Sequence, residues 1–265
     1  KRGTTTKHLT EMEGDDDMRH YYTSAMSMGL VLLLGATALA RADRPEEKKC
    51  AGLPGTAELH ALLVAAPNTG GTAGGLFEGK RMWGAIVNRQ GEVCTVTTST
   101  TDPAQAWPGS QAIAKAKAYT ANAFSLDSLA LSTARLFTFV QPGHSLYGLN
   151  QSNLFNPKFL APPTGQGGGD GQIAGGIITF GGGVPLYKNG KIIGGLGISG
   201  DTACTDHEVA KRVRDLVNLN PPGGPLVDDI TYSSADGASV FTHPLCVNTY
   251  RDGAFIGNEA AAVGY

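Results

Sequence analysis

Residues 184–199, VPLYKNGKIIGGLGIS, contain the strongest local folding signal in this chain. Two β-forming runs flank Asn189-Gly190, a dipeptide that favours the tight turn of a two-residue hairpin. A short apolar run just upstream, GIITF at 176–180, has the length and composition of a further strand. We therefore expect three strands in quick succession along this part of the chain.

A second hairpin is expected further upstream. The β-rich segments MWGAIVN at 82–88 and EVCTVTT at 92–98 are separated by Arg89-Gln90-Gly91, with glycine where a short connection needs it. Together with the downstream strands they predict an antiparallel sheet of about five strands.

Helical patterns alternate with these hairpins. Their order excludes a doubly wound parallel fold and predicts an α+β domain, in which an antiparallel sheet of about five strands carries helices on its faces. A stretch with four prolines and many glycines indicates a long irregular loop at 141–176. The predicted helices occupy residues 55–66, 103–124, 128–140 and 202–219.

Composition narrows the possible functions. The chain has 265 residues and a formal net charge of −2, and no lysine- or arginine-rich run stands out. Nucleic-acid binding depends on a concentrated positive surface. We therefore expect no nucleic-acid partner.

The first 42 residues are expected to be absent from the mature protein. Residues 1–17 lack an initial methionine and carry an acidic run, so we interpret them as an upstream segment that is not native. Residues 18–42 are typical of a secretory signal peptide, with an apolar run at 29–40 before a small-x-small cleavage site. That run is shorter than the roughly 20 residues that span a bilayer. We expect a periplasmic or secreted protein beginning at Asp43 without a stable membrane anchor; a retained anchor is the alternative.

The exported part is expected to form one domain over 43–246, followed by a C-terminal tail at 247–265. An even number of cysteines in an oxidising compartment favours two disulfides, although four cysteines allow three pairings. We favour Cys50 with Cys246, which would join the two ends, and Cys94 with Cys204. Four buried free thiols are the alternative. Metal binding through cysteine alone is not favoured, because the sequence has no Cys-x-x-Cys pair.

Several glycine-rich segments resemble nucleotide or hydrolase motifs only in part. Residues 195–200, GLGISG, match G-x-G-x-x-G, but the second parallel strand and later acidic residue of a dinucleotide site are missing. We interpret these glycines as allowing a strand and a helix to pack closely. Segments 165–171 and 181–183 lack the ending of a phosphate-binding loop, and Asp201 replaces the second glycine of a serine-hydrolase elbow.

Three histidines are candidate metal ligands. Cys204-Thr205-Asp206-His207 lies at the predicted start of the last helix, but covalent haem attachment needs Cys-x-x-Cys-His and is excluded. A histidine on the first helical turn favours the neutral imidazole that coordinates iron, which makes His207 the first candidate. A lone helical histidine is also often a packed or surface residue. His144 in the long loop and His243 near the C-terminus are rivals, whereas His60 is expected on the solvent face of the first helix.

Other polar residues are less specific. Lys115 and Lys117 would either line a pocket for an anionic ligand or lie on an exposed helix face. No spacing singles out two acidic side chains for acid/base work, so no catalytic residue is assigned. The acidic residues considered were Asp127, Asp201, Asp206 and Glu208.

Three segments together carry a family likeness: GAIVNRQGEV at 84–93, AKAKAYTANAF at 114–124 and FGGGVPLYKNGKIIGGLGISG at 180–200. They resemble the GlcG/HbpS-like family over roughly residues 55–219. The resemblance implies a profilin-like domain of α-β-α layers that forms symmetric oligomers and, in some members, binds haem non-covalently or senses redox state. Gly182, in the Gly-Gly-x-Pro piece, then joins His207, His144, His243 and Lys117 as a cofactor-binding candidate.

We therefore expect an exported, non-enzymatic protein that binds haem b or another tetrapyrrole non-covalently, forms a homo-oligomer, and uses His207 as its metal ligand. Two alternatives stay open. One is an oligomeric accessory protein of a periplasmic oxidation system that holds no cofactor, and the other is an enzyme acting on a small molecule.

Overall fold

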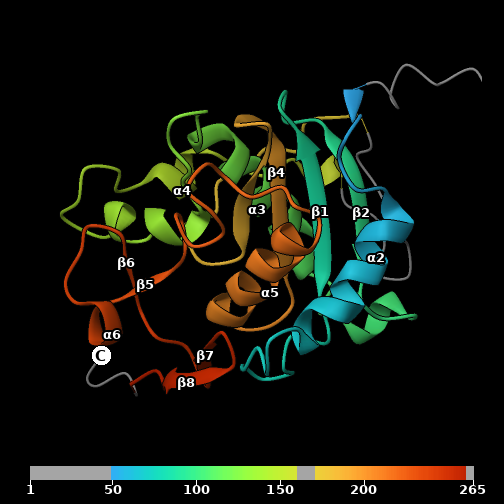
Figure 1. The fold of residues 1–265 in the computed structure, drawn as a ribbon. Coiled ribbons are helices and arrows are strands. Elements are labelled where there is room, and N and C mark those ends of the chain that lie inside the picture. Colours follow the sequence, from blue (N-terminus) through green and yellow to red (C-terminus); the bar gives the residue numbers. More distant parts are fainter. Residues whose placement is uncertain (1–48, 160–170, 261–265) are drawn as a thin grey trace, which may run out of the picture. The chain divides into compact units, whose positions relative to one another are not determined.

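The computed structural model describes residues 49–159 and 171–260. Its centre is a four-stranded antiparallel sheet in the order β2-β1-β4-β3 (Figure 1). Both predicted hairpins are confirmed, and antiparallel pairing of β1 with β4 joins them into one sheet. The strands are β1 Trp83–Asn88, β2 Val93–Thr98, β3 Gly183–Lys188 and β4 Lys191–Ser199.

The fifth strand expected at 176–180 is wrong, because these residues form no strand. The segment passes over α3, the helix Ser110–Phe124, and bonds to it instead of to a neighbouring strand. The N–H of Ile178 donates to the hydroxyl of Thr120 on α3 at 3.0 Å. The Thr120 hydroxyl thus accepts the N–H that a carbonyl of a neighbouring strand would accept in a sheet. The α+β prediction is confirmed, with four strands in the main sheet.

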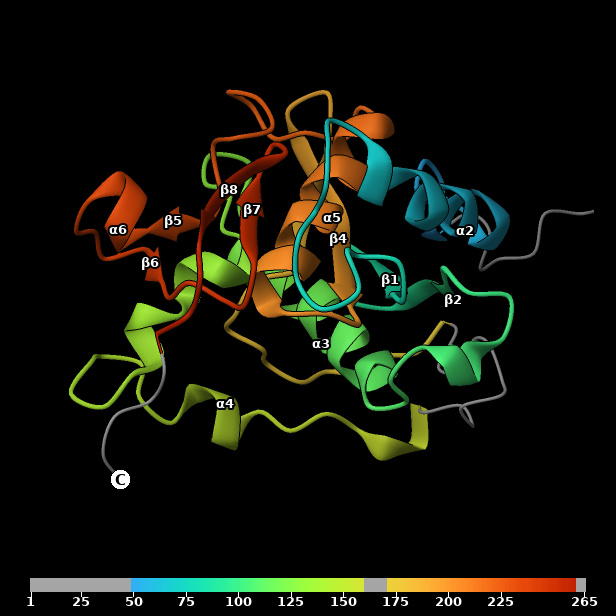
Figure 2. The same ribbon diagram turned by 90° about the horizontal axis from the view of Figure 1, so that it is seen from below.

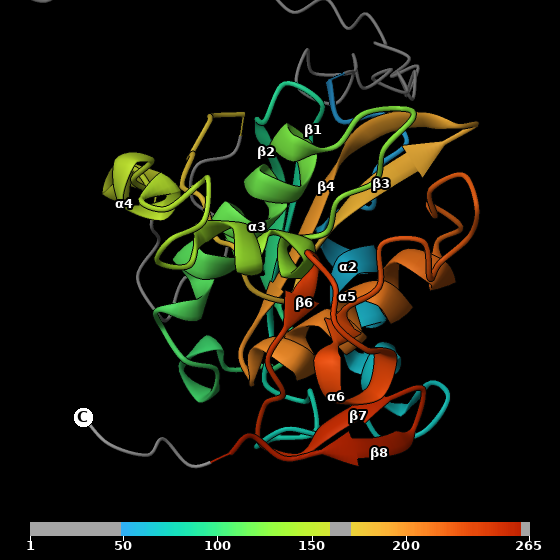
Figure 3. The ribbon, with the colours of Figure 1, turned by 90° about the vertical axis from the view of Figure 1, so that its left-hand side faces the viewer.

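Helices cover both faces of this sheet (Figure 3). α3 packs on one face, while α2 (Thr56–Ala65) and α5 (Ala203–Leu216) lie on the other. Successive side chains of β1 point to opposite faces of the sheet, so the strand contributes to both helical layers. Trp83 and Val87 pack in the core under α3, whereas Ile86 packs in the core under α2 and α5. The α-β-α layering implied by the family resemblance is confirmed.

Glycines in β4 let α3 approach the sheet closely. A Cβ atom on Gly197 would lie 2.5 Å from the Ala118 nitrogen and would overlap the carbonyl oxygen of Ala114. A Cβ atom on Gly195 would lie 3.0 Å from the Asn122 nitrogen. The G-x-G-x-x-G match therefore serves close packing of strand on helix, as the sequence predicts.

The helix expected at 128–140 is wrong. Two short 3-10 helices occupy this region, at Thr133–Leu136 and Thr138–Val140. The hydroxyl of Ser132 donates to the Asp228 carbonyl at 2.7 Å, and that of Thr133 donates to the Phe180 carbonyl at 2.6 Å. These side chains hold the segment to distant parts of the chain, which competes with continuous helix.

The other predicted helices are confirmed with shifted ends. The first continues as a 3-10 helix at Ala66–Asn68. Of the stretch predicted to be helical from residue 103, only α3 is α-helix, preceded by a 3-10 helix at Pro103–Gln105. The long loop is irregular where it is described, with α4 at Leu149–Ser152 and a 3-10 helix at Pro157–Phe159.

Beyond α5, as far as residue 260, the chain forms short strands and one short helix. The strands β5 and β6 pair in parallel, and β7 and β8 form a hairpin beside α5 (Figure 2). A bridge between Gly74 and Thr249 also ties β7 to the loop after α2. These elements are β5 Thr231–Tyr232, α6 Ser233–Asp236, β6 Thr242–His243, β7 Thr249–Arg251 and β8 Ala254–Gly257.

Two disulfides are present, as predicted, but the favoured pairing of Cys50 with Cys246 and of Cys94 with Cys204 is wrong. Cys50 pairs with Cys94 and Cys204 pairs with Cys246, with Cα–Cα distances of 5.8 and 5.9 Å. The segment before α2 lies against the β1–β2 turn, where Lys49 binds Glu92 at 2.7 Å. The C-terminal segment instead lies against the start of α5. Each cysteine therefore pairs with the cysteine that the fold places within disulfide-bonding distance.

Segments 1–17 and 18–42, interpreted above as an upstream segment and a signal peptide, lie outside the described residues, as do 160–170 and 261–265. Over 49–159 and 171–260, no helix is both long and apolar enough to cross a membrane.

Candidate functional site

Four of the five predicted cofactor residues meet where β4 ends and α5 begins. Lys117 comes from α3, His207 from the first turns of α5 and His243 from β6, and Gly182 is the residue before β3. We call Lys117, Asp206, His207, Asp229 and His243 the buried polar cluster, because all five side chains are largely inaccessible to solvent. His144 is exposed in the long loop and does not belong to it.

Lys117 and Asp206 form a buried ion pair. The Lys117 ammonium donates to Asp206 Oδ2 at 2.6 Å and to the Ile198 carbonyl at 3.0 Å, and it lies 4.8 Å from the centre of the Phe180 ring. Burial lowers the pKa of Lys117, and the Asp206 carboxylate opposes that shift. Burial raises the pKa of Asp206 to about 6, against the pull of Lys117. Lys117 and Asp206 therefore already bind each other and are not free to bind a ligand.

His207 contacts a second carboxylate. Its Nε2 lies 3.4 Å from Asp229 Oδ1, and Lys211 approaches Asp229 Oδ2 at 3.2 Å. Burial alone would raise the pKa of Asp229, but the hydrogen bond and charge of His207 and the charge of Lys211 hold it well below its usual range. The other ring nitrogen of His207, Nδ1, is buried and has no hydrogen-bond partner.

The buried polar cluster has no room for a macrocycle. A Cβ atom on Gly182 would already lie 2.5 Å from the Ile198 carbonyl oxygen and 2.6 Å from Lys117 Nζ. Asp229 lines a cavity of about 250 Å³, smaller than the roughly 300 Å³ at which small-molecule sites begin. Iron ligation by His207 stays a prediction, and this packing argues against it.

A groove between α2 and β2 offers a better-placed histidine. His60 is half-buried rather than fully on the solvent face, and its Nδ1 lies 2.7 Å from the Thr98 carbonyl. Because a carbonyl oxygen only accepts, Nδ1 carries a proton, and in the neutral ring this leaves the lone pair on Nε2. The groove measures about 510 Å³ and is lined by Thr56, Ala57, His60, Thr97, Thr100 and Thr101.

Local sequence gave little sign of this groove. Leu59 and Leu63 mark the buried stripe of α2, and His60 lies beside that stripe. Its carbonyl partner belongs to β2, 38 residues away, so only the packing of α2 on the sheet brings the two together.

A family model described as "Haem degrading protein HbpS-like" matches residues 72–215, which is more than half of the chain. The chain belongs to the HbpS-like family. The match covers the main sheet, α3 and α5. His60 and His243 lie outside it, so the HbpS-like match assigns a role to neither.

Curated relatives match part of this chain. The corrinoid adenosyltransferase PduO of Salmonella typhimurium (strain LT2) is 33% identical over 110 residues, covering 42% of this chain and 25% of PduO. A 15.0 kDa protein of Citrobacter freundii, from the dhaT-dhaS intergenic region, is 35% identical over 99 residues, covering 37% of this chain and 52% of that protein. The chain thus spans about a quarter of PduO and half of the smaller relative.

Two solved structures are also similar. A PduOC:Heme complex has 29% sequence identity and a TM-score of 0.39, covering 53% of this chain and 80% of that chain. A double mutant of Streptomyces reticuli HbpS has 16% identity and a TM-score of 0.37, covering 72% and 97%.

Acid is expected to destabilise the folded protein because His243 is buried in its neutral form. Burial lowers the pKa of His243 to about 4; the Pro244 carbonyl opposes this shift, and the charges of His207 and Lys117 add to it. In the unfolded chain histidine binds a proton near pH 6.5. The unfolded state therefore holds more protons between these values, and stability is lost as the pH falls from about 6.5 to 4, by about 3 kcal/mol in all.

Urea unfolding between pH 7 and pH 4 measures this loss. His243→Gln cannot titrate, so its free energy of unfolding should fall less steeply over the same range. Identical slopes for the two proteins would contradict the assignment.

Proposed function

We propose that this protein is exported and binds haem b non-covalently in the groove lined by His60. Membership of the HbpS-like family supports haem as the ligand class. The observation that carries the location is the geometry of His60, whose Nδ1 faces the Thr98 carbonyl at 2.7 Å while Nε2 keeps its lone pair. A hydrogen bond of this kind orients a ligating imidazole and increases its basicity.

The groove fits a flat ligand better than the buried polar cluster does. At about 510 Å³ it lies within the range of small-molecule sites, and it opens on solvent, so a macrocycle larger than the groove would enter by one edge. Bound haem would supply an iron centre whose potential depends on its axial ligand and on the polarity around it.

Binding without turnover is the form of activity that we propose. Threonine, alanine and His60 line the groove, and no carboxylate is among these residues. Acid/base chemistry on a bound tetrapyrrole would need a positioned titratable group besides the iron ligand. The name of the family model mentions haem degradation, so the experiment must distinguish holding from degrading.

Titration of the purified protein with hemin tests the proposal. We expect a shifted Soret band at one haem per chain. His60→Ala should weaken binding by about tenfold or more, since it removes the ligand itself. The matched control is His144→Ala, which removes an exposed histidine outside the groove. This variant should bind hemin with the affinity of the unmutated protein.

Other outcomes separate the alternatives. Loss of the band in His207→Ala or His243→Ala, with His60→Ala unaffected, would move the site to the buried polar cluster. No Soret shift in the unmutated protein would remove the haem proposal. Decay of the band with ascorbate and oxygen would make the protein a haem-degrading enzyme.

Self-association and export belong to the same proposal. The long loop exposes Tyr147 and Leu154, with 64% and 79% of their surface accessible, and a second copy of this chain would cover such residues. Light scattering after gel filtration should give a multiple of the chain mass. Mass spectrometry of protein secreted by an exporting host should place the mature N-terminus at Asp43.

A further inference from the structure

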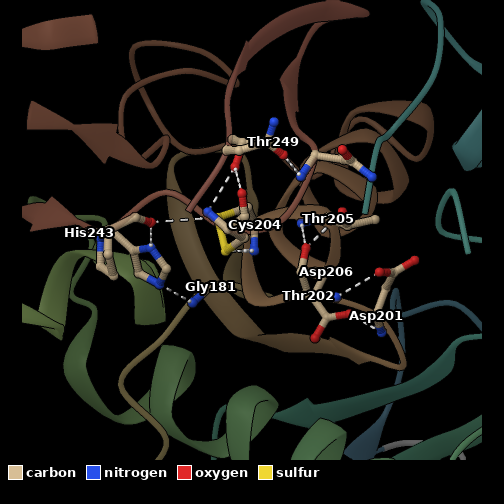
Figure 4. The surroundings of a disulfide bond; sticks show 12 residues. Gly181, Asp201, Thr202, Cys204, Thr205, Asp206, His243 and Thr249 are labelled. Atoms are coloured by element: carbon tan, nitrogen blue, oxygen red, sulfur yellow. Dashed lines mark hydrogen bonds between the residues drawn. A yellow bond between two sulfur atoms is a disulfide. The ribbon is translucent and has the colours of Figure 1, made fainter. Parts of the chain in front are cut away.

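The disulfide between Cys204 and Cys246 lies beside a histidine (Figure 4). The two sulfur atoms and a ring nitrogen of His243 all lie within 4.8 Å of one another, and the three residues are buried. Over the described residues this is the one group of three or more side chains placed to share a metal ion. It shares no residue with the His60 groove.

We propose that reduction of the Cys204–Cys246 disulfide converts this site into a zinc-binding site, with Cys204, Cys246 and His243 as ligands. A dithiol reductant gives two electrons and two protons to the disulfide and becomes a disulfide itself. Zn²⁺ then replaces the two thiol protons, which are released to water. Oxidation by a disulfide partner reverses the sequence and expels the ion.

Both sulfur atoms lie where a thiolate is stabilised. Cys204 is the second residue of α5, at the positive end of the helix, where thiol deprotonation is favoured. The backbone N–H of Cys204 donates to Cys246 Sγ at 3.1 Å. Thiolate is the form of cysteine that binds zinc. The groups that would stabilise the negative charge of the two thiolates are therefore already in place in the oxidised protein.

The imidazole of His243 is held as a metal ligand usually is. Its Nδ1 lies 2.7 Å from the Pro244 carbonyl, so this nitrogen donates, and the lone pair at Nε2 accepts a single N–H, from Gly181 at 3.3 Å. Hydrogen bonding of one ring nitrogen to a backbone carbonyl is typical of zinc-binding histidines. Figure 4 shows this ring beside Gly181 and to one side of the disulfide.

His207, one helical turn further on, is the candidate for a fourth ligand. His207 follows Cys204 by three residues and so shares its face of α5. Its Nδ1 is buried without a hydrogen-bond partner. Rotation of the His207 ring toward the two sulfur atoms, or a bound water molecule, would supply the fourth ligand of the tetrahedral coordination that zinc prefers.

Access to the site requires the C-terminal segment to open. Cys246 lies between β6 and β7, which belong to two separate two-stranded sheets. Small two-stranded sheets are less stable than larger ones, so this segment should open more readily than the main sheet. The other disulfide, Cys50–Cys94, has no comparable third ligand among the described residues.

The test uses the four cysteines of the full chain as their own controls. The protein is reduced with a water-soluble phosphine, freed of reductant under nitrogen, and alkylated with and without Zn²⁺, and each cysteine is followed by mass spectrometry. We expect zinc to slow alkylation of Cys204 and Cys246 by about tenfold or more, and to leave Cys50 and Cys94 unchanged. Reduced protein should retain one zinc ion per chain, and oxidised protein none.

Two variants and a second readout complete the experiment. Cobalt in place of zinc should give thiolate charge-transfer bands and tetrahedral visible bands in the reduced protein. His243→Ala should lose protection and the tetrahedral bands, whereas His60→Ala should keep both. Equal protection of all four cysteines, or unchanged binding in His243→Ala, would overturn the proposal. If the reduced protein unfolds, recovery of its circular dichroism on adding zinc supports the site, and failure to recover overturns it.

Discussion

Lys117→Met should destabilise the folded protein by about 3–5 kcal/mol, because it leaves the Asp206 carboxylate buried without its charge partner. Lys117 is completely buried and binds Asp206 at 2.6 Å. Methionine keeps much of the side-chain volume and removes only the charge and its hydrogen bonds. Urea unfolding followed by the fluorescence of the buried Trp83 measures the change.

The double variant Lys117→Met/Asp206→Asn distinguishes the loss of a charge partner from loss of packing. Asparagine can still accept the Asp201 N–H, which Asp206 accepts at 2.9 Å, but carries no charge. The double variant should therefore be more stable than Lys117→Met alone. Lys191→Met, which breaks the exposed pair with Asp127, should change stability far less. Equal stability of the single and double variants would show that the buried charge is not the cause.

Gly197→Ala is expected to destabilise the folded protein by about 3 kcal/mol, at the upper end of the usual cost of overpacking, because the strand has no space for a methyl group. The added Cβ atom would overlap the Ala114 carbonyl oxygen and lie 2.5 Å from the Ala118 nitrogen. Both are backbone atoms of α3, so no side chain can rotate away and the whole helix must move from the sheet. Thermal unfolding by circular dichroism measures the loss.

Gly109→Ala is the matched control. Gly109 precedes α3 with φ −63° and ψ −25°, and a Cβ atom there would meet nothing within 4 Å. The free energy of unfolding of Gly109→Ala should lie within about 1 kcal/mol of that of the unmutated protein, because alanine adopts this conformation without strain. If the two variants lost stability equally, close packing of β4 on α3 would not be the reason.

The elements predicted correctly are those with local signals. The turn at Asn189-Gly190 and the Gly91 turn each lie between β-forming runs, so the hairpins follow from adjacent residues. The helix at 128–140 failed because Ser132 and Thr133 bond to carbonyls at residues 228 and 180. No window of local sequence contains those partners.

The candidate sites show the same division. The sequence marked His207 and His243 as chemically interesting, but it did not reveal that both side chains would be buried. It placed His60 on the solvent face, because the Thr98 carbonyl is 38 residues away. The favoured cysteine pairing failed for a related reason, since it assumed that the two ends of the domain meet.

By itself, the sequence determined the two hairpins, the three main helices and the family, because turn residues, hydrophobic periodicity and motif spacing act between neighbours in the chain. The tertiary structure decided the pairing of β1 with β4, the partners of the four cysteines, the burial of Lys117 with Asp206, and the approach of Cys204 to His243. These contacts join residues that are distant in the sequence, and the packing of helices and loops around the sheet selects them.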